Sequence, residues 1–308
     1  MAYKEGWVLV NGIPTHVLTW GCWIDDPKPD GKSIILCISG NPGVTPFYKR
    51  FLCALNKQLD MPIWILSHAG HELPPMSINM KMPKNNKLFT LSGQIQHKAA
   101  FIKKYIPEDQ NIYFIGHSVG AKIVSELLKN ENLCKRTKKC YLVFPTLERI
   151  AETPNAKFFI PLATYFTPTI LFFAWIFSCF PNMLRSILVK TFFIVARRIK
   201  IDETCLEAAL HLILPAVLKK VFFLAMDEMD TIKELEIQAL NEFKDKLKIY
   251  FTPTDNWAPL SHYESLKAAM PDIDATVLSE QFQHAFVLDM PEETATLLSE
   301  EIKKEQAK

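Results

Sequence analysis

Residues 111–128, NIYFIGHSVGAKIVSELL, contain the signals of a buried strand, a glycine-flanked serine and a helix in direct succession. The first five residues are mostly apolar, and apolar side chains recur at helical spacing over residues 121–128. Between these two segments, Gly116-His117-Ser118-Val119-Gly120 matches the pattern G-x-S-x-G. The pattern is typical of a sharp strand-to-helix turn that presents a nucleophilic serine, although a glycine-bearing turn without chemistry also fits it.

A turn of this kind, the nucleophile elbow, makes specific demands on its neighbours. Gly116 and Gly120 are small enough for the backbone to pass a strained serine, and His117 fills the variable position before it. The helix that begins at Val119 would stabilise negative charge developing on a substrate. The stretch therefore predicts that Ser118 is a nucleophile, provided that the rest of the chain supplies its partners.

A hydrolytic serine needs a general base and a carboxylate that orients the base. In a parallel α/β sheet these groups follow the ends of later strands, in the order serine, acid, histidine. Asp255 follows the apolar run 247–251, and His284 follows the last expected strand at 276–278. Each residue taken alone is better explained as a turn or loop residue. The order of all three residues predicts a Ser118–Asp255–His284 triad.

The loop after the apolar run 34–38 is the expected source of oxyanion donors. It contains Gly40-Asn41-Pro42-Gly43, in which the glycines allow a close backbone approach and the proline has no N–H. The first donor would be the N–H of Val119, directly after the nucleophile. The sequence predicts Asn41 as the second donor and Gly43 as the alternative, and a plain tight turn remains the competing explanation.

Strand and helix signals alternate along most of the chain. The alternation predicts a mostly parallel central sheet with helices on both faces. It stops after the strand expected at 140–144 and resumes at 247–251. We therefore expect a core formed by residues 1–150 and 246–308, with an insertion over residues 151–245.

Composition narrows the classes of partner and cofactor. The net charge of the 308-residue chain is +2 and its basic residues are dispersed, which argues against nucleic acid as a partner. Seven scattered cysteines without a C-x-x-C pair fit a reducing compartment and do not predict a zinc site. His68 and His71 flank a glycine without a matching carboxylate set, so we expect them to be structural. No signal peptide, metal or cofactor is expected.

The insertion begins with the uncharged stretch 158–184, FFIPLATYFTPTILFFAWIFSCFPNML. It is long enough to span a bilayer, but we expect Pro161 and Pro168 to interrupt it and Pro181 to mark a turn. A single crossing would also separate the later strands from the earlier ones. We therefore expect helices that enter one lipid leaflet, or a buried cap over the active site, and the two can coexist. The aromatic residues expected to meet lipid are Phe158, Phe159, Phe172, Phe173, Trp175, Phe177 and Phe180.

Several segments together resemble the lipid droplet-associated hydrolases. They are GNPG at 40–43, SHAGH at 67–71, GQIQHKAAF at 93–101, GHSVG at 116–120, FPTLERIAETPN at 144–155, and the later TDNWAP and QHAF. The resemblance covers nearly the whole chain and implies an α/β-hydrolase fold with an apolar helical cap. It also implies a serine hydrolase at the lipid droplet surface and the cytosolic face of the endoplasmic reticulum membrane. The family substrate that it implies is a sterol ester or another neutral lipid ester.

Two functional classes remain open from the sequence. In the first, Ser118 attacks a neutral lipid ester, such as a sterol ester or an acylglycerol, and water releases the acyl-enzyme. In the second, the chain binds and organises the droplet surface and has weak or vestigial esterase activity. Transfer of the acyl group to an alcohol would use the same residues as hydrolysis, so sequence does not separate the two reactions.

Overall fold

A computed structural model describes residues 3–27 and 33–307, and eight strands of this part form one mixed sheet. The strand order is β1-β2-β4-β3-β5-β6-β7-β8. β2 pairs antiparallel with β1 and β4, and the pairs β4–β3, β3–β5, β5–β6, β6–β7 and β7–β8 are parallel. The strands are β1 Lys4–Val10, β2 Ile13–Trp20, β3 Ile34–Ile38, β4 Ile63–Leu66, β5 Ile112–His117, β6 Thr137–Val143, β7 Leu247–Phe251 and β8 Ala275–Val277.

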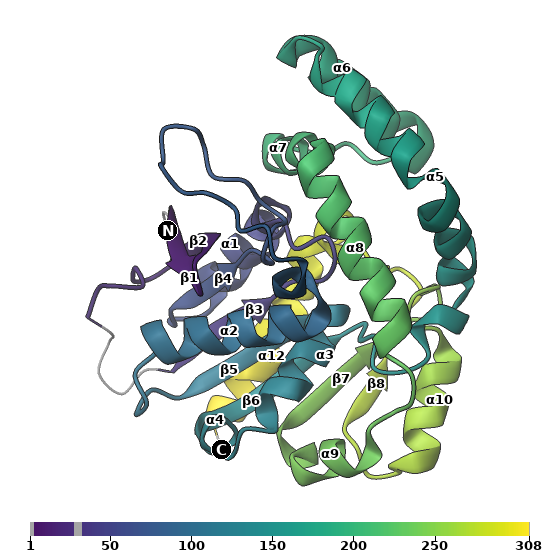
Figure 1. Ribbon diagram of the computed structural model, residues 1–308. Helices are drawn as coiled ribbons and strands as arrows, with labels where there is room; N and C mark the ends of the chain where they lie inside the picture. Colours follow the sequence, from purple (N-terminus) through teal and green to yellow (C-terminus); the bar gives the residue numbers. More distant parts are fainter. Residues whose placement is uncertain (1–2, 28–32, 308) are drawn as a thin grey trace.

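Helices cover both faces of this sheet (Figure 1). α2 (Leu91–Tyr105) and α3 (Val119–Leu128) pack on one face, and α1 (Lys49–Gln58) and α12 (Pro291–Gln306) pack on the other. β3 and β4 are apolar along their whole length, and β5 is apolar up to Gly116, because both faces of these central strands are buried. The arrangement confirms the α/β architecture expected from the alternating pattern. Shorter elements are η1 Thr45–Tyr48, η2 Asn86–Phe89, α4 Glu131–Arg136, η3 Ile150–Glu152, η5 Lys244–Lys246, α10 Leu260–Ala269 and α11 Phe286–Asp289.

The chain between β6 and β7 forms a helical cap. Its elements are α5 Pro154–Ser178, α6 Asn182–Phe192, the π-helical turn η4 Phe193–Arg197, α7 Glu203–Leu212, α8 Pro215–Thr231 and α9 Ile237–Glu242. α5 packs along α8, and α6 packs against α7. Because β6 and β7 are parallel neighbours in the sheet, the chain leaves at the carboxyl end of β6 and returns at the opposite edge of the sheet, where β7 begins. The exact domain boundaries remain a prediction from sequence.

The expectation that prolines interrupt the first apolar stretch is wrong. α5 continues for 25 residues through both Pro161 and Pro168, and the break falls at Pro181, where α6 begins. Each internal proline removes one N–H from the hydrogen-bond ladder. The intact turns on either side nevertheless keep the helix continuous. α5 is long and apolar enough to cross a membrane, and only 11% of its apolar 18-residue stretch is buried inside the protein.

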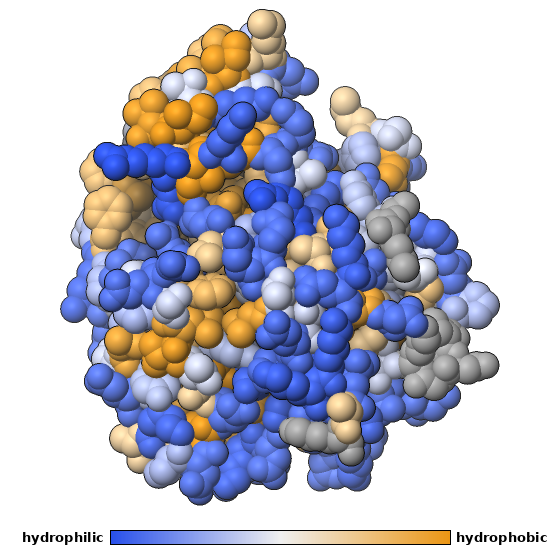
Figure 2. All heavy atoms as spheres, turned by 180° about the vertical axis from the view of Figure 1, so that it is seen from behind, coloured by the Kyte–Doolittle hydropathy of each residue, from blue (hydrophilic) through white to orange (hydrophobic). Residues whose placement is uncertain are grey.

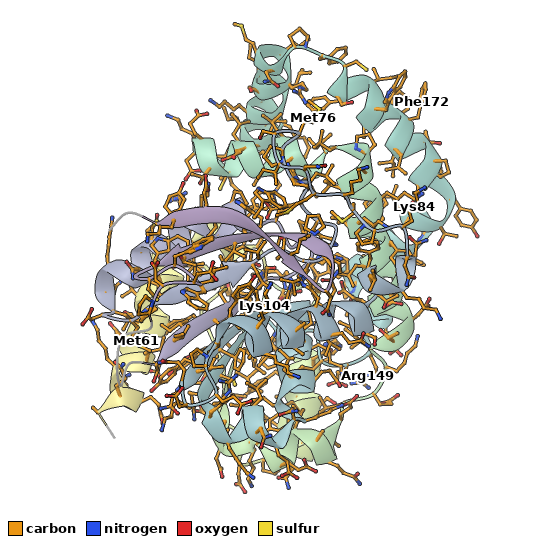
Figure 3. The ribbon with its side chains drawn as sticks, turned by 60° about the vertical axis from the view of Figure 1, so that its left-hand side comes forward. Met61, Met76, Lys84, Lys104, Arg149 and Phe172 are labelled. Atoms are coloured by element: carbon orange, nitrogen blue, oxygen red, sulfur yellow. The ribbon has the colours of Figure 1, made fainter. Side chains whose placement is uncertain are left out.

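α5, α6 and η4, residues 154–197, form an apolar arm at the edge of the molecule (Figure 1). Seen from behind, hydrophobic side chains gather over this part of the surface (Figure 2). Phe172 points away from the body of the protein (Figure 3). The exposed aromatic side chains of the arm include Phe158 at 76%, Phe173 at 61%, Trp175 at 56%, Phe172 at 55% and Phe180 at 39%.

Two aromatic residues expected at a lipid surface turn inward instead. The Phe159 ring packs edge-on against Phe222 of α8, with ring centroids 5.4 Å apart. Phe177 lines an apolar cavity of about 300 Å³ between the arm and α7. Residues 159 and 177 lie on the side of α5 that faces the cap, so helical phase excludes them from the exposed set. Both side chains are half-buried, and their contact with lipid stays a prediction.

Candidate active site

Ser118 occupies the turn between β5 and α3, with backbone angles of φ 54° and ψ −123°. These angles are strained for a residue with a side chain. Gly116 and Gly120, which flank this serine, leave no room for a side chain. A Cβ at Gly120 would lie 2.2 Å from the Ile38 carbonyl oxygen, and a Cβ at Gly116 would lie 2.8 Å from the Ala121 Cα. The turn therefore has the geometry of a nucleophile elbow, and its sequence pattern follows from packing.

The loops after β7 and β8 bring two side chains to this serine. His284 Nε2 lies 3.0 Å from Ser118 Oγ, and His284 Nδ1 lies 2.7 Å from Asp255 Oδ2. When Asp255 accepts the Nδ1 proton, Nε2 has a lone pair directed at the serine hydroxyl. The structure thus places the three residues of the expected triad in one hydrogen-bonded chain, as the strand order predicted.

Asp255 is buried and held in its ionised form. It is 2% exposed, and its Oδ1 accepts hydrogen bonds from the backbone N–H groups of Trp257 at 2.7 Å and Ala258 at 3.0 Å. Burial raises the pKa of this carboxyl, but the charge and hydrogen bond of His284 and the two backbone donors outweigh it. The pKa of Asp255 consequently lies below its usual value, and a carboxylate is available to stabilise a protonated His284.

His117 has a larger role than the sequence indicated. The hydroxyl of Tyr48 accepts the N–H of Gly40 at 2.8 Å, so its single proton points to His117 Nδ1, 2.6 Å away. His117 Nε2–H then donates to the His284 carbonyl oxygen at 2.8 Å. Burial, together with the neighbouring His284, lowers the pKa of His117 to about 3, which keeps the ring neutral. His117 therefore connects the oxyanion loop, the elbow and the histidine loop.

The expected oxyanion donors differ in their availability. Val119 is the first residue of α3, so its N–H has no acceptor within the helix. Asn41 lies one residue after Gly40, where a Cβ would approach the Ser118 Cβ to 3.0 Å. The loop therefore passes directly beside the nucleophile. Gly43 is not a free donor, because its N–H donates to His71 Nδ1 at 3.0 Å. This bond removes the alternative that the sequence left open.

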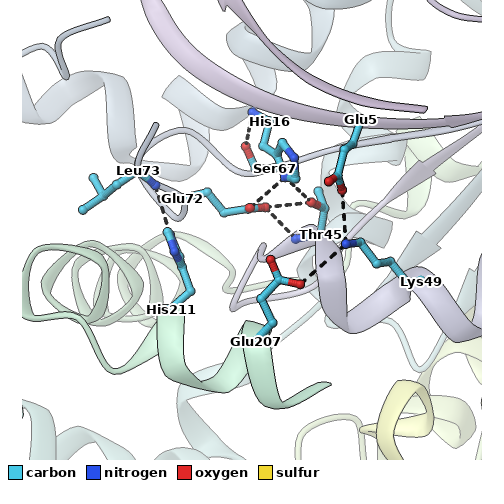
Figure 4. Close-up of polar contacts among 9 residues, drawn as sticks. All are labelled: Glu5, His16, Thr45, Lys49, Ser67, Glu72, Leu73, Glu207 and His211. Carbon is cyan, nitrogen blue, oxygen red and sulfur yellow. Dashed lines mark hydrogen bonds and ion pairs between the residues drawn. The ribbon is translucent and has the colours of Figure 1, made fainter. Parts of the chain in front are cut away.

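A buried carboxylate fixes the far end of the oxyanion loop (Figure 4). Glu72 Oε1 accepts from the N–H and the hydroxyl of Thr45 at 2.7 and 2.8 Å, and Oε2 lies 2.8 Å from His16 Nδ1. Burial raises the pKa of Glu72, but the His16 charge and the hydrogen bonds from His16 and Thr45 outweigh it and lower the pKa. His71, whose pKa burial lowers to about 3, holds Gly43 beside it. These contacts could not be predicted from the sequence.

Access to the nucleophile is narrow in this structure. Ser118 is 8% exposed, and the His284 side chain is 18% exposed. The cap contacts the oxyanion loop, since α8 accepts hydrogen bonds from the Asn41 side chain. In the described part of the chain, no group of three or more metal-ligating side chains is present. The site therefore combines a serine hydroxyl within hydrogen-bond distance of a histidine and the Val119 N–H, which has no acceptor within its helix.

The fold and this arrangement define the class of the protein, the α/β-hydrolases. A serine hydrolase from the bacterium Cycloclasticus zankles has a similar structure, with a TM-score of 0.64 over 98% of both chains at 15% identity. Residues 31–287 match the family model of the lipid-droplet associated hydrolases. The chain is 40% identical to the lipid droplet-associated hydrolase of Drosophila melanogaster over 97% of its length and 98% of that protein. It is 32% identical to the mouse protein, over 96% and 94%. The chain belongs to the lipid droplet-associated hydrolase family, as its motifs indicated.

Proposed function

We propose that this protein hydrolyses a neutral lipid ester, of the sterol ester or acylglycerol class, through an acyl-enzyme. Ser118 Oγ attacks the carbonyl carbon while His284 Nε2 takes its proton and Asp255 stabilises the resulting imidazolium. The N–H groups of Val119 and Asn41 bind the oxyanion. His284 then gives its proton to the leaving alcohol, and a water molecule, deprotonated by His284, releases the acid.

The observation that carries the chemical part of this proposal is the continuous hydrogen-bonded chain at the elbow. The two distances, 3.0 Å from serine to histidine and 2.7 Å from histidine to aspartate, are those of a base already directed at its nucleophile. The chain joins residues from three separate strand ends, 29 and 166 positions apart. An ordinary turn serine has no need of such partners. The arrangement therefore supports an activated nucleophile.

The apolar arm supports a lipid substrate and a lipid surface. Its exposed aromatic side chains make an unusually apolar surface for a protein in water. The arm also borders the cavity of about 300 Å³, whose lining is apolar and includes Phe47 of η1 and Val189 of α6. A hydrocarbon chain fits such a lining. Because β6 and β7 are neighbours, both ends of the cap stay on one side of a membrane, which favours insertion into one leaflet.

The names of the relatives support the location. The Drosophila and mouse proteins are called lipid droplet-associated hydrolases. We extend that location, together with the cytosolic face of the endoplasmic reticulum membrane, to this chain. Lys190, Arg197 and Arg198 flank the apolar side chains of the arm and would lie among anionic headgroups.

The chemical proposal is tested with a fluorophosphonate probe, which phosphonylates activated serines. The purified wild type should be labelled, Ser118→Ala should not be labelled, and His284→Ala should be labelled at least about 100-fold more slowly. Circular dichroism would show that both variants are folded. A folded wild type that resists labelling in detergent contradicts the proposed chemistry.

A second function is favoured by the arm itself. A protein that exposes this much apolar surface can bind and organise a droplet surface even if its turnover is slow. The variant Ser118→Ala distinguishes hydrolysis from surface binding, because it removes the nucleophile and leaves the arm unchanged. If droplets in cells keep their size and number when Ser118→Ala replaces the wild type, the surface role explains the protein better than hydrolysis does.

A further inference from the structure

Asn41 is held by the cap, although it follows a strand of the core. Its side-chain amide donates to the Val221 carbonyl oxygen at 3.1 Å and to Glu228 Oε1 at 2.9 Å, and both acceptors belong to α8. The loop residues on either side of it, Gly40 and Gly43, are fixed instead by core side chains. The conformation of the oxyanion loop therefore depends on contacts from both parts of the fold.

Glu228 has no part in the triad, yet it is buried in the cap. It is 3% exposed, and its hydrogen-bond partner in the described part of the chain is the Asn41 amide. An ionised carboxylate buried without a countercharge is costly. Burial raises the pKa of Glu228 to about 8; the Asn41 hydrogen bond opposes this rise and the nearby Asp227 adds to it. Glu228 is thus mainly neutral at pH 7, and it binds Asn41 without placing a negative charge beside the oxyanion site.

We propose that Glu228 is a positioning residue, which orients Asn41 so that its backbone N–H points at the carbonyl oxygen of the bound substrate. The inference rests on the proposed function, because it requires Ser118 to attack a carbonyl group. A small displacement of the loop matters here, since the neighbouring Gly40 already lies against the Ser118 side chain. Displacement of α8 would release Asn41, so docking of the cap and stabilisation of the oxyanion are linked events.

The competing explanation is that Glu228 only attaches the cap to the core. Asp227, its neighbour on α8, provides a matched comparison. Asp227 Oδ2 accepts a hydrogen bond from the Leu91 N–H at 2.7 Å, which ties the same helix to α2 without contact with the oxyanion loop. Loss of cap attachment should therefore appear in both variants, whereas loss of Asn41 orientation should appear only at Glu228.

The test compares Glu228→Ala, Glu228→Gln and Asp227→Ala as purified full-length proteins, with a soluble short-chain nitrophenyl ester. Removal of one oxyanion donor typically costs about 100- to 1000-fold in kcat, so a misplaced donor should cost about 10- to 100-fold. We expect this loss in Glu228→Ala, with KM changed by less than about twofold, because the N–H acts on charge that develops only in the transition state. Glu228→Gln keeps an acceptor oxygen and should retain kcat within about threefold.

Asp227→Ala should retain kcat within about twofold. An equal loss of kcat in Asp227→Ala and Glu228→Ala, or an unchanged kcat in Glu228→Ala, overturns the positioning role. If Glu228→Ala does not fold, Asn41→Ala makes the same test from the loop side, since it keeps the backbone N–H and removes its anchor. Labelling of the wild type by the fluorophosphonate separates failure of the proposed function from failure of this inference. If the wild type is not labelled, the proposed chemistry is overturned. If it is labelled normally and the Glu228 variants keep their kcat, only the positioning role of Glu228 is overturned.

Discussion

Two buried carboxyl groups near Ser118 differ in their protonation state. Asp255 and Glu228 are 2% and 3% exposed, so burial alone would raise the pKa of both. Asp255 faces His284 and accepts two backbone N–H bonds, and its pKa is lowered. Glu228 accepts a hydrogen bond from a neutral amide, and its pKa is raised to about 8. The partners of each carboxyl group, rather than its depth, make one of them a carboxylate and the other an acid at neutral pH.

Of these two carboxyl groups, Glu228 keeps its proton to the higher pH, which leads to a prediction for the pH profile. Above a pH of about 8 the ionised form predominates and brings negative charge towards the developing oxyanion. The kcat of the wild type should therefore fall as pH rises through about 8. In Glu228→Gln this alkaline fall should be absent. Stopped-time assays from pH 6 to 10 measure it, and an identical fall in both proteins would assign it to another group.

At the active site, the sequence predicted the three triad residues, because their positions follow from the order of the strands. Ser118, Asp255 and His284 could be found because each follows the end of a strand, and the structure brings them together. The contacts of His117 and Glu228 could not be predicted. They join residues 69 and 187 positions apart, and no local pattern records which side chain a buried group will meet.

At the scale of elements, the strand at 247–251 has the bounds that the sequence indicated. It is a short apolar run that ends just before Pro253, so its limits can be read from the sequence. The prediction for α5 was poorer, because its stretch is apolar all round. A helix of this kind has no polar face to set its rotation, so sequence does not show which aromatic residues face the cap.

The exposed part of α5 leads to a prediction for surface binding. The triple variant Phe172→Ser, Phe173→Ser, Trp175→Ser removes three aromatic groups that are more than half exposed. We expect it to lose at least about tenfold in binding to phospholipid-coated triacylglycerol emulsions, since each buried aromatic group adds about 1.5–3 kcal/mol. Flotation of the emulsion with bound protein measures it.

The control for this experiment is an exposed apolar residue outside the arm. Met76, on the loop that precedes η2, is fully exposed, and Met76→Ser should leave emulsion binding unchanged (Figure 3). Fluorophosphonate labelling in detergent should be equal in all three proteins, because none of these side chains contacts the triad. Unaltered flotation of the triple variant would show that α5 is not the lipid-binding element.

At the scale of the whole molecule, the buried pair His16–Glu72 joins segments that are distant in sequence. It ties β2 to the loop after β4 and, through Thr45, to η1 (Figure 4). Burial lowers the pKa of His16, but Glu72 outweighs this effect and the pKa is raised. The charged pair therefore supports the region where the oxyanion loop, the cap and the sheet edge meet.

This pair leads to a prediction for stability. Glu72→Gln removes one charge of a buried ion pair, which should lower the free energy of unfolding by about 3–5 kcal/mol. In the wild type, the contribution of the pair should be lost as pH falls through the lowered pKa of Glu72 and as pH rises through the raised pKa of His16. Urea unfolding across this range measures both effects.

An exposed ion pair serves as the control for Glu72→Gln. Lys135 lies 3.7 Å from Glu131, with side chains 76% and 87% exposed. Lys135→Gln should change the free energy of unfolding by less than about 1 kcal/mol. A similar small effect for Glu72→Gln would mean that the buried pair contributes little to the folded state.

The apolar arm also determines how such a protein would meet its substrate. A molecule held on a lipid surface searches in two dimensions, so its encounters depend on the number of ester molecules per unit area. Once all of the protein is bound, more surface of the same composition adds no encounters, whereas dilution of the ester by inert lipid removes them. Because the arm and the covering helix α8 belong to one continuous insertion, adsorption to the surface and admission to Ser118 depend on the same piece of chain. The rate of ester cleavage by such a protein would then be set by the composition of the lipid surface rather than by the amount of lipid present.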